Sequence, residues 1–179
     1  MKRVAVIGSG GAGKSVFSRE LGDRTGLPVV HLDREFWRPG WDPTPDEAWE
    51  ARVRELVAAD RWVMDGNYSG TMLIRFERAD TVIFLDVPRA LCVASALWRS
   101  ARYRGDSRPD MTEGNKERLD LEFLKWIWSY PRAKRPSILA RLAALPPTTR
   151  VIRLTSRGAV RRWLDAVTPA SPTIVGAAE

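Results

Sequence analysis

Short apolar runs separated by longer amphipathic stretches make up most of this chain. Five apolar runs, each ending at a glycine, a proline or a charged residue, predict buried strands at residues 2–7, 28–32, 61–65, 80–87 and 150–154. Segments of helical periodicity lie between the strands. This alternation predicts an α/β domain with a five-stranded parallel sheet covered by helices on both faces.

The apolar positions also predict which side of each helix faces the core. Helices are expected at 14–25, 46–59, 71–78, from Arg89 into a basic segment at 99–104, and at 111–128, 137–145 and 159–167. In the helix from Arg89, the spacing of Leu91, Ala94, Leu97 and Trp98 predicts the core-facing side. Thr44 is expected to be the N-cap of the helix at 46–59. Pro131 is expected to end the helical region that begins at Met111.

A glycine-rich stretch follows the first predicted strand and precedes the first predicted helix. It matches the phosphate-binding P-loop pattern, in which backbone N–H groups surround a polyphosphate at a helix N-terminus. Its residues are Gly8, Ser9, Gly10, Gly11, Ala12, Gly13, Lys14 and Ser15. The pattern predicts that Lys14 contacts the β- and γ-phosphates and that the Ser15 hydroxyl binds Mg²⁺. The expected fold is therefore the three-layer P-loop NTPase fold.

Polar residues close the second and third predicted strands, where open α/β sheets place their sites. Asp33 and Arg34 follow the second strand and are candidates for substrate contact; a helix cap or a surface ion pair is the alternative. Asp65 ends the third strand and is a candidate Mg²⁺ ligand opposite Ser15; a turn-forming Asp-Gly pair is the alternative. His31, the only histidine, is expected to be structural.

Two further segments are candidate parts of a site. Trp37 and Trp41 lie in a loop rich in proline and glycine, and they either cover a substrate pocket or pack on the domain. Arg99, Arg102, Arg104 and Arg108 lie close together in sequence. They form either a solvated basic helix end or a lid at about 99–118 that places guanidinium groups on a transferring phosphate. Thr155, after the fifth strand, is a candidate contact for the nucleotide base.

Composition narrows the classes of function. The chain has 179 residues and a formal net charge of +7, which suits an anionic ligand, either a nucleotide or a nucleic acid. The sequence contains no helix-turn-helix, zinc or basic-tail signature, so charge alone does not predict DNA binding. A single cysteine, Cys92, and the lack of a signal-peptide pattern or an apolar membrane span lead us to expect a cytoplasmic protein. One domain over 1–167 and a disordered tail over 168–179 are expected.

Several motifs together resemble the small P-loop kinases of the adenylate-kinase superfamily. The chain is more closely similar to bacterial proteins known as DNA topology modulation or FlaR-like proteins, over residues 3–145. Besides the P-loop, the resemblance rests on His31-Leu32-Asp33 with Phe36-Trp37, on Asp65-Gly66-Asn67-Tyr68, and on the segments at 84–88, 104–111 and 122–126. Asn67-Tyr68 stands where adenylate kinases have Phe-Pro, and no arginine follows at once.

The resemblance implies roles for individual residues. Asp65 would assist Mg²⁺, Arg99 would stack on adenine, Arg108 would contact the donor phosphates, and Asp33 would hold the acceptor hydroxyl. The resemblance thus implies an ATP- and Mg²⁺-dependent transfer of phosphate to a small-molecule hydroxyl or phosphate. From their own chemistry and place in the sequence, Arg34, Trp37, Asn67 and Tyr68 are further candidate acceptor contacts. A nucleotide-dependent DNA-binding or regulatory protein and a simple NTPase are the alternatives. The sequence predicts no oligomeric state.

Overall fold

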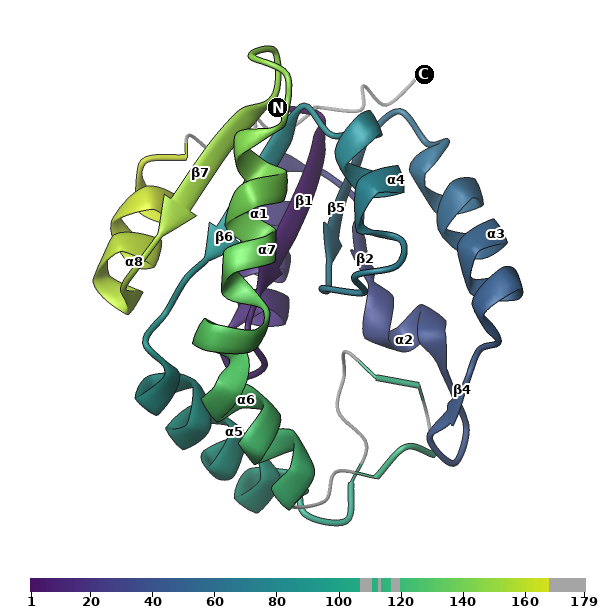
Figure 1. Cartoon of the computed structure of the whole chain (residues 1–179), viewed down its shortest axis with the longest axis vertical. Coiled ribbons are helices and arrows are strands. Elements are labelled where there is room, and N and C mark those ends of the chain that lie inside the picture. Colours follow the sequence, from purple (N-terminus) through teal and green to yellow (C-terminus); the bar gives the residue numbers. More distant parts are fainter. Residues whose placement is uncertain (107–110, 113, 117–119, 168–179) are drawn as a thin grey trace, which may run out of the picture.

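A five-stranded parallel sheet forms the centre of the molecule, seen in a computed structural model that describes residues 1–106, 111–112, 114–116 and 120–167 (Figure 1). The strand order is β2-β5-β1-β6-β7, and every pairing in this sheet is parallel. The strands are β1 (Arg3–Gly8), β2 (Val29–His31), β5 (Trp62–Asp65), β6 (Thr81–Leu85) and β7 (Arg150–Leu154). The predicted fold class is confirmed.

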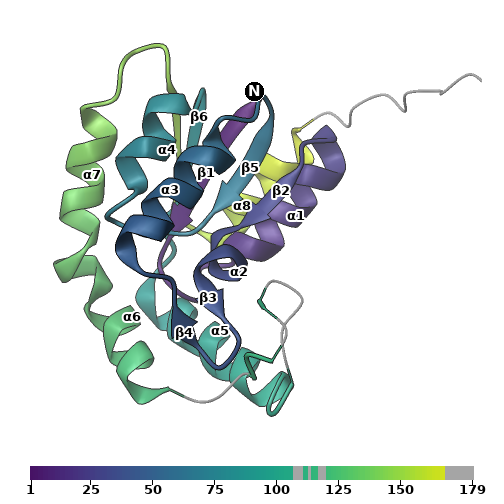
Figure 2. The ribbon, with the colours of Figure 1, turned by 90° about the vertical axis from the view of Figure 1, so that its right-hand side faces the viewer.

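Helices cover both faces of this sheet (Figure 2). The helices α3, α4 and α7 lie on one face and α1 and α8 on the other, while α5 and α6 extend past the edge at which the strands end. The bounds are α1 (Lys14–Thr25), α2 (Leu32–Phe36), α3 (Asp46–Val57), α4 (Met72–Arg78), α5 (Arg89–Arg102), α6 (Leu121–Ala133), α7 (Arg135–Ala143) and α8 (Arg157–Asp165). A small antiparallel hairpin, β3 (Trp37–Arg38) and β4 (Asp42–Pro43), follows α2.

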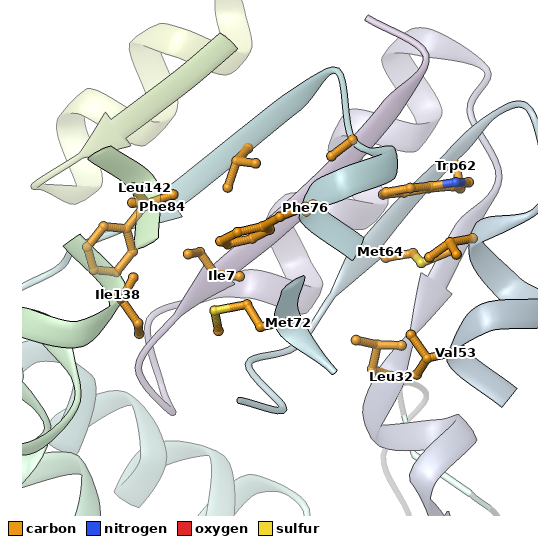
Figure 3. Packing of buried hydrophobic residues seen from close by; sticks show 14 of the residues in the cluster. Ile7, Leu32, Val53, Trp62, Met64, Met72, Phe76, Phe84, Ile138 and Leu142 are labelled. Atoms are coloured by element: carbon orange, nitrogen blue, oxygen red, sulfur yellow. The ribbon is translucent and has the colours of Figure 1, made fainter. Parts of the chain in front are cut away.

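Alternate residues of the strands enter two separate apolar cores, because successive side chains of a strand point to opposite faces. Ile7 and Phe84 pack with α3, α4 and α7, as Figure 3 shows around Met72, Phe76 and Ile138. The neighbouring strand positions pack instead with α1, α5 and α8. Both faces are buried, which explains why the strands appear as continuous apolar runs in the sequence.

The apolar face predicted for α5 is wrong. Leu91, Leu97 and Trp98 are 39%, 43% and 63% exposed, whereas Cys92 and Ala96 are buried. The P-loop approaches this helix closely: a Cβ at Gly11 would lie 2.1 Å from the Cys92 carbonyl oxygen. Only small side chains fit at such a contact, so packing with the P-loop selects the face with the smaller residues.

The helix predicted over 111–128 begins only at Leu121. The described residues before it are not helical, and Thr112 and Asn115 bond to the backbone of the hairpin instead. Pro131 does not end the helix, which continues to Ala133. The predicted arginine-rich lid at about 99–118 lies partly outside the described residues, which omit 107–110, 113 and 117–119. The predicted disordered tail, 168–179, lies entirely outside them.

Two local predictions near α2 also differ from the structure. Pairing of β2 ends at His31, opposite Asp65, and the chain turns at once into α2, so Asp33 lies in the first turn of a short helix. Thr44 does not cap α3; its hydroxyl donates to the Phe36 carbonyl at 2.6 Å and ties the end of the hairpin to α2. Within the described chain, no helix combines the length and apolar character needed to cross a membrane.

Candidate active site

The P-loop lies at the strand ends, between β1 and the first turn of α1. Gly13 has φ +92°, a left-handed conformation that glycine adopts without strain, and α1 begins at the next residue. A Cβ at Gly10 would lie 2.5 Å from the Phe123 ring, so the loop packs closely against this side chain of α6. The Ser9 side chain is buried, and its hydroxyl has no hydrogen-bond partner in the described part of the chain.

Lys14 curls back over the loop that carries it. Its Nζ donates to the carbonyl oxygens of Gly8 and Ser9, each at 3.0 Å. Burial lowers the pKa of the Lys14 ammonium below its usual value, and the carboxylates of Asp33 and Asp65 partly offset this effect. A polyphosphate at the loop would supply the negative charge that stabilises this buried ammonium.

Three polar side chains form a line beneath the start of α1. Asp65, only 3% exposed, has one carboxylate oxygen 2.5 Å from Nδ1 of His31 and accepts a 3.4 Å hydrogen bond from the Ser15 hydroxyl at the other. The two predicted metal ligands are therefore adjacent. His31, expected to be structural, holds the carboxylate of Asp65 in place. This contact arises because β2 and β5 pair with His31 opposite Asp65.

Asp33 lies on α2, at the end of the cleft nearest β2. The Tyr68 hydroxyl donates to its Oδ1 at 2.7 Å. Burial raises the pKa of Tyr68 well above its usual value, and the neighbouring Asp33 carboxylate raises it further. The phenol therefore stays protonated and acts as a fixed donor that orients Asp33.

A buried arginine on α4 holds the loop that carries Asn67 and Tyr68. Arg75 is fully buried and donates to the carbonyl oxygens of Gly66 at 2.7 Å, of Asn67, and of Tyr68 at 3.4 Å. Burial lowers the pKa of Arg75 to about 10, so it remains charged at neutral pH. Asn67 in turn accepts a 3.0 Å hydrogen bond from the Gly8 N–H and links this loop to the P-loop.

The hairpin with Trp37 and Trp41 is hydrogen-bonded to Thr112, Asn115 and Lys116. The Thr112 hydroxyl donates to the Trp37 carbonyl at 2.6 Å. Asn115, 1% exposed, accepts from the Trp41 N–H at 2.8 Å and donates to the Arg38 carbonyl at 3.0 Å. Trp41 has φ +62°, which is uncommon for a residue with a bulky side chain, and these bonds hold it there.

One cleft of about 1540 Å³ joins these parts. Its middle is formed by the P-loop, and one end is formed by residues of α2, the hairpin and the loop after β5, which are Asp33, Trp37, Trp41, Gly66, Asn67 and Tyr68. The other end lies between α5 and α8 and is lined by Leu91, Ala94, Ser95, Trp98, Arg157, Val160, Arg161 and Leu164. Figure 1 shows that α2 follows the edge strand β2 and that α8 follows the opposite edge strand β7.

The cleft contains some of the predicted site residues and not others. Gly10 to Ser15, Asp33, Trp37, Asn67, Tyr68 and Arg99 line it. Asp65 lies beneath the floor, in contact with Ser15. Arg34, Arg104 and Thr155 are exposed and do not line the cleft, and Arg102 packs against Trp98, with its guanidinium 5.3 Å from the ring centroid. Arg108 lies outside the described residues.

The sequence reasoning missed several residues of the site. Leu91 and Trp98 were expected in the core but face the cleft. Arg157 belongs to the polar loop after the fifth strand from which Thr155 was chosen as the candidate nucleotide contact. It is Arg157 that lines the cleft, and its bond to Ser95 joins α8 to α5. The position of Arg75 in the sequence could have indicated its burial. It lies on the same side of α4 as the apolar residues Met72 and Phe76, so it either is buried with them or interrupts the apolar face.

Comparison with known proteins identifies the fold. No family model matches the chain, and no curated protein matches it. Among solved structures, shikimate kinase from Acinetobacter baumannii in complex with shikimate is similar at 17% identity and a TM-score of 0.55, covering 92% of this chain and 89% of that one. A gluconokinase from Sinorhizobium meliloti 1021 is similar at 14% identity and a TM-score of 0.50, covering 92% and 94%. At these identities the likeness concerns the fold, and the chain has the fold of small P-loop kinases.

Proposed function

We propose that this protein is an ATP-dependent small-molecule kinase that transfers the γ-phosphate of ATP to an acceptor bound beside Asp33. The observation that carries the proposal is that one cleft contains three parts. The P-loop forms its middle, one end has Asp33 and aromatic residues, and the other end is formed by α5 and α8. A phosphate donor and an acceptor that enter from opposite ends would meet at Lys14. Transfer in such an arrangement depends mainly on positioning and electrostatics.

The P-loop residues fit a nucleotide triphosphate. The loop packs closely against the Cys92 backbone and the Phe123 ring, and Gly10 to Ser15 line the cleft. The hydroxyl of buried Ser9 lacks a partner among the described residues, and Lys14 is bonded only to carbonyls of the loop itself. The apolar end between α5 and α8, with Leu91 and Trp98, is proposed to take the adenine, and Arg99 the phosphates.

Ser15 and Asp65 would hold Mg²⁺. A hydroxyl and a carboxylate 3.4 Å apart are the hard oxygen ligands that this ion prefers, with the ATP phosphates and water completing its shell. When bound, the ion neutralises charge on the phosphates. The chain's own contribution is geometric: His31 holds Asp65, and the start of α1 places Ser15 above it.

Asp33 would orient the acceptor hydroxyl and accept its proton. The Tyr68 hydroxyl occupies one carboxylate oxygen, so the other is available to the acceptor. A nucleoside monophosphate acceptor and membership in the FlaR-like family are finer possibilities within this proposal. They rest on motifs over 3–145 rather than on the cleft.

The test is ADP release from ATP·Mg²⁺ across nucleoside monophosphates, nucleosides, sugars and hydroxylated antibiotics. We expect one class to raise the rate well above the background without acceptor. Lys14→Ala should lower that rate by about 10²- to 10³-fold through loss of phosphate stabilisation. Asp33→Asn should lower turnover with little change in ATP affinity, whereas Asp42→Asn, at an exposed ion pair of the hairpin, should change neither. An acceptor-independent rate would favour a simple NTPase instead.

A further inference from the structure

Aromatic side chains form the wall of the acceptor end of the cleft. The ring centroids of Trp37 and Trp41 lie 5.7 Å apart, and Phe36 lies 4.9 Å from Trp37 and 4.8 Å from Tyr68. Trp37, Trp41 and Tyr68 line the cleft directly. Trp49 of α3 closes the cluster from behind, 5.1 Å from Phe36 and 4.9 Å from Tyr68. An acceptor in this end therefore meets ring faces and edges rather than aliphatic side chains.

These rings are held before any ligand arrives. Asn115 and Thr112 bond the backbone of Trp41 and Trp37, and the Trp41 indole N–H donates to the Lys116 carbonyl at 3.2 Å. Arg75 fixes the loop of Tyr68 through three carbonyls. A wall that is already ordered loses little entropy on binding, so its shape and charge select the ligand.

In the part of the chain that the structure describes, the charged side chain of this end is Asp33, and the Lys14 ammonium of the P-loop lies close enough to interact with it. Asp33 is the carboxylate that α2, the hairpin and the 66–68 loop contribute to the cleft, and among described residues none of these segments, nor 111–116, contributes a lysine or arginine to it. The nearby arginines have other positions. Arg34, next to Asp33 on α2, is exposed and does not line the cleft. Arg38 is exposed with its Nε 3.5 Å from the Asp42 carboxylate, and Arg75 is fully buried. The described cations that line the cleft, Lys14, Arg19, Arg24, Arg99, Arg157 and Arg161, belong to α1, α5 and α8.

We propose, on the basis of the kinase function proposed above, that the acceptor carries no negative charge and is a polyhydroxylated ring, either neutral or bearing an ammonium group. Its apolar face would lie on Trp37 and Trp41, and one hydroxyl would bond to Asp33. Indole faces attract C–H groups and cations. A carboxylate or phosphate on the acceptor would be repelled by Asp33. The described cations that line the cleft lie instead on α1, α5 and α8, where Lys14 would pair with the phosphates of the donor.

The test compares ring compounds that differ in charge and share a skeleton. One series is glucuronate, glucose and glucosamine; the other is quinate, inositol and an aminocyclitol. Binding to the full chain is measured by calorimetry with a non-hydrolysable ATP analogue and Mg²⁺ present. We expect a neutral or cationic member of at least one series to bind at least about tenfold more tightly than its anionic partner. Tighter binding of the anion, or no binding by any neutral or cationic member, would overturn the proposal.

Variants locate the binding. Trp37→Leu should weaken binding of the neutral ring by about tenfold, whereas Trp128→Leu, at a half-exposed tryptophan of α6 outside the cleft, should leave it unchanged. Asp33→Asn should reduce the advantage of the ammonium compound over the neutral one. Equal effects of both tryptophan variants would show that the rings of the acceptor end are not the binding surface. The charge comparison on the unmodified chain does not depend on how these variants fold.

ADP formation is measured separately with the same compounds. Binding of a neutral ring without ADP formation from any acceptor would contradict the kinase function while upholding the charge selectivity. ADP formation that is fastest with glucuronate or quinate would uphold the kinase and overturn the selectivity. The two failures are therefore distinguishable.

Discussion

At the scale of the residue, the Tyr68–Asp33 hydrogen bond shows how one side chain sets the chemistry of another. The Tyr68 hydroxyl donates a hydrogen bond to Asp33, the residue proposed to contact the acceptor. It can donate this bond only while it is protonated. Tyr130 is also buried, and burial raises its pKa too. Both tyrosines therefore keep their protons in the folded chain at pH values where they lose them on unfolding.

This difference predicts a pH dependence of stability. Above about pH 10, the usual tyrosine pKa, each of these phenols holds one proton in the folded state and none in the unfolded state. The free energy of unfolding should therefore fall by about 1.4 kcal/mol per pH unit for each of them. Tyr68→Phe should remove one such contribution, and Tyr68→Phe with Tyr130→Phe should remove both. Urea unfolding at several pH values between 9.5 and 11 checks this; an unchanged slope in Tyr68→Phe would contradict it.

At the scale of the element, α4 supports the site without entering it. Its buried arginine reaches the carbonyls of the loop after β5, and that loop bonds through Asn67 to the P-loop. The hairpin is supported similarly by Thr112, Asn115 and Lys116. The loop after β5 and the β3–β4 hairpin are thus each held by side chains from other parts of the chain.

Arg75→Met should therefore destabilise the whole domain. The change leaves the Gly66 and Asn67 carbonyls without their buried donor, which we expect to lower the free energy of unfolding by about 2–4 kcal/mol. Arg75→Lys should not restore it, because an ammonium lacks the fork that contacts several carbonyls at once. Arg78→Met, at an exposed position of the same helix, should change it by less than about 0.5 kcal/mol. Equal losses in Arg75→Met and Arg78→Met, measured by urea unfolding, would contradict the supporting role.

At the scale of the molecule, the net charge of +7 has to be reconciled with the cleft. The described cations in the cleft line its middle and the α5–α8 end, where a nucleotide would bind. The remaining bases are distributed along the chain. A charge of this kind binds DNA through phosphates alone, without reading its sequence.

DNA binding should accordingly be weak and strongly dependent on salt. We expect affinity for a duplex, followed by fluorescence anisotropy, to fall by about 10³-fold or more between 50 and 200 mM salt, and to be the same for unrelated sequences. Duplex DNA should not stimulate ADP release. Salt-resistant binding of one sequence, or stimulation by DNA, would instead favour the nucleotide-dependent DNA-binding protein.

The local sequence determined much of this architecture. Five strands, their parallel arrangement and the bounds of α1 and β7 follow from the sequence pattern. The signal is strongest for β1, β5 and β6, which are buried on both faces. The P-loop could be found because its chemistry is contained in eight consecutive residues. Asp33 and Asp65 could be named as candidates because strand ends in such sheets meet at one edge.

Only the tertiary structure decided what surrounds those residues. The spacing of apolar residues in α5 predicted the wrong face, because the close approach of Gly11 to Cys92 outweighs the burial of larger side chains. Thr112 and Asn115 could be placed in a helix by pattern, yet their bonds to the hairpin prevail. His31 and Asp65, which contact each other, are 34 positions apart in the sequence. Arg75 and Gly66, which are hydrogen-bonded, are 9 positions apart. Contacts across such separations depend on how strands and helices are assembled, which no local pattern encodes.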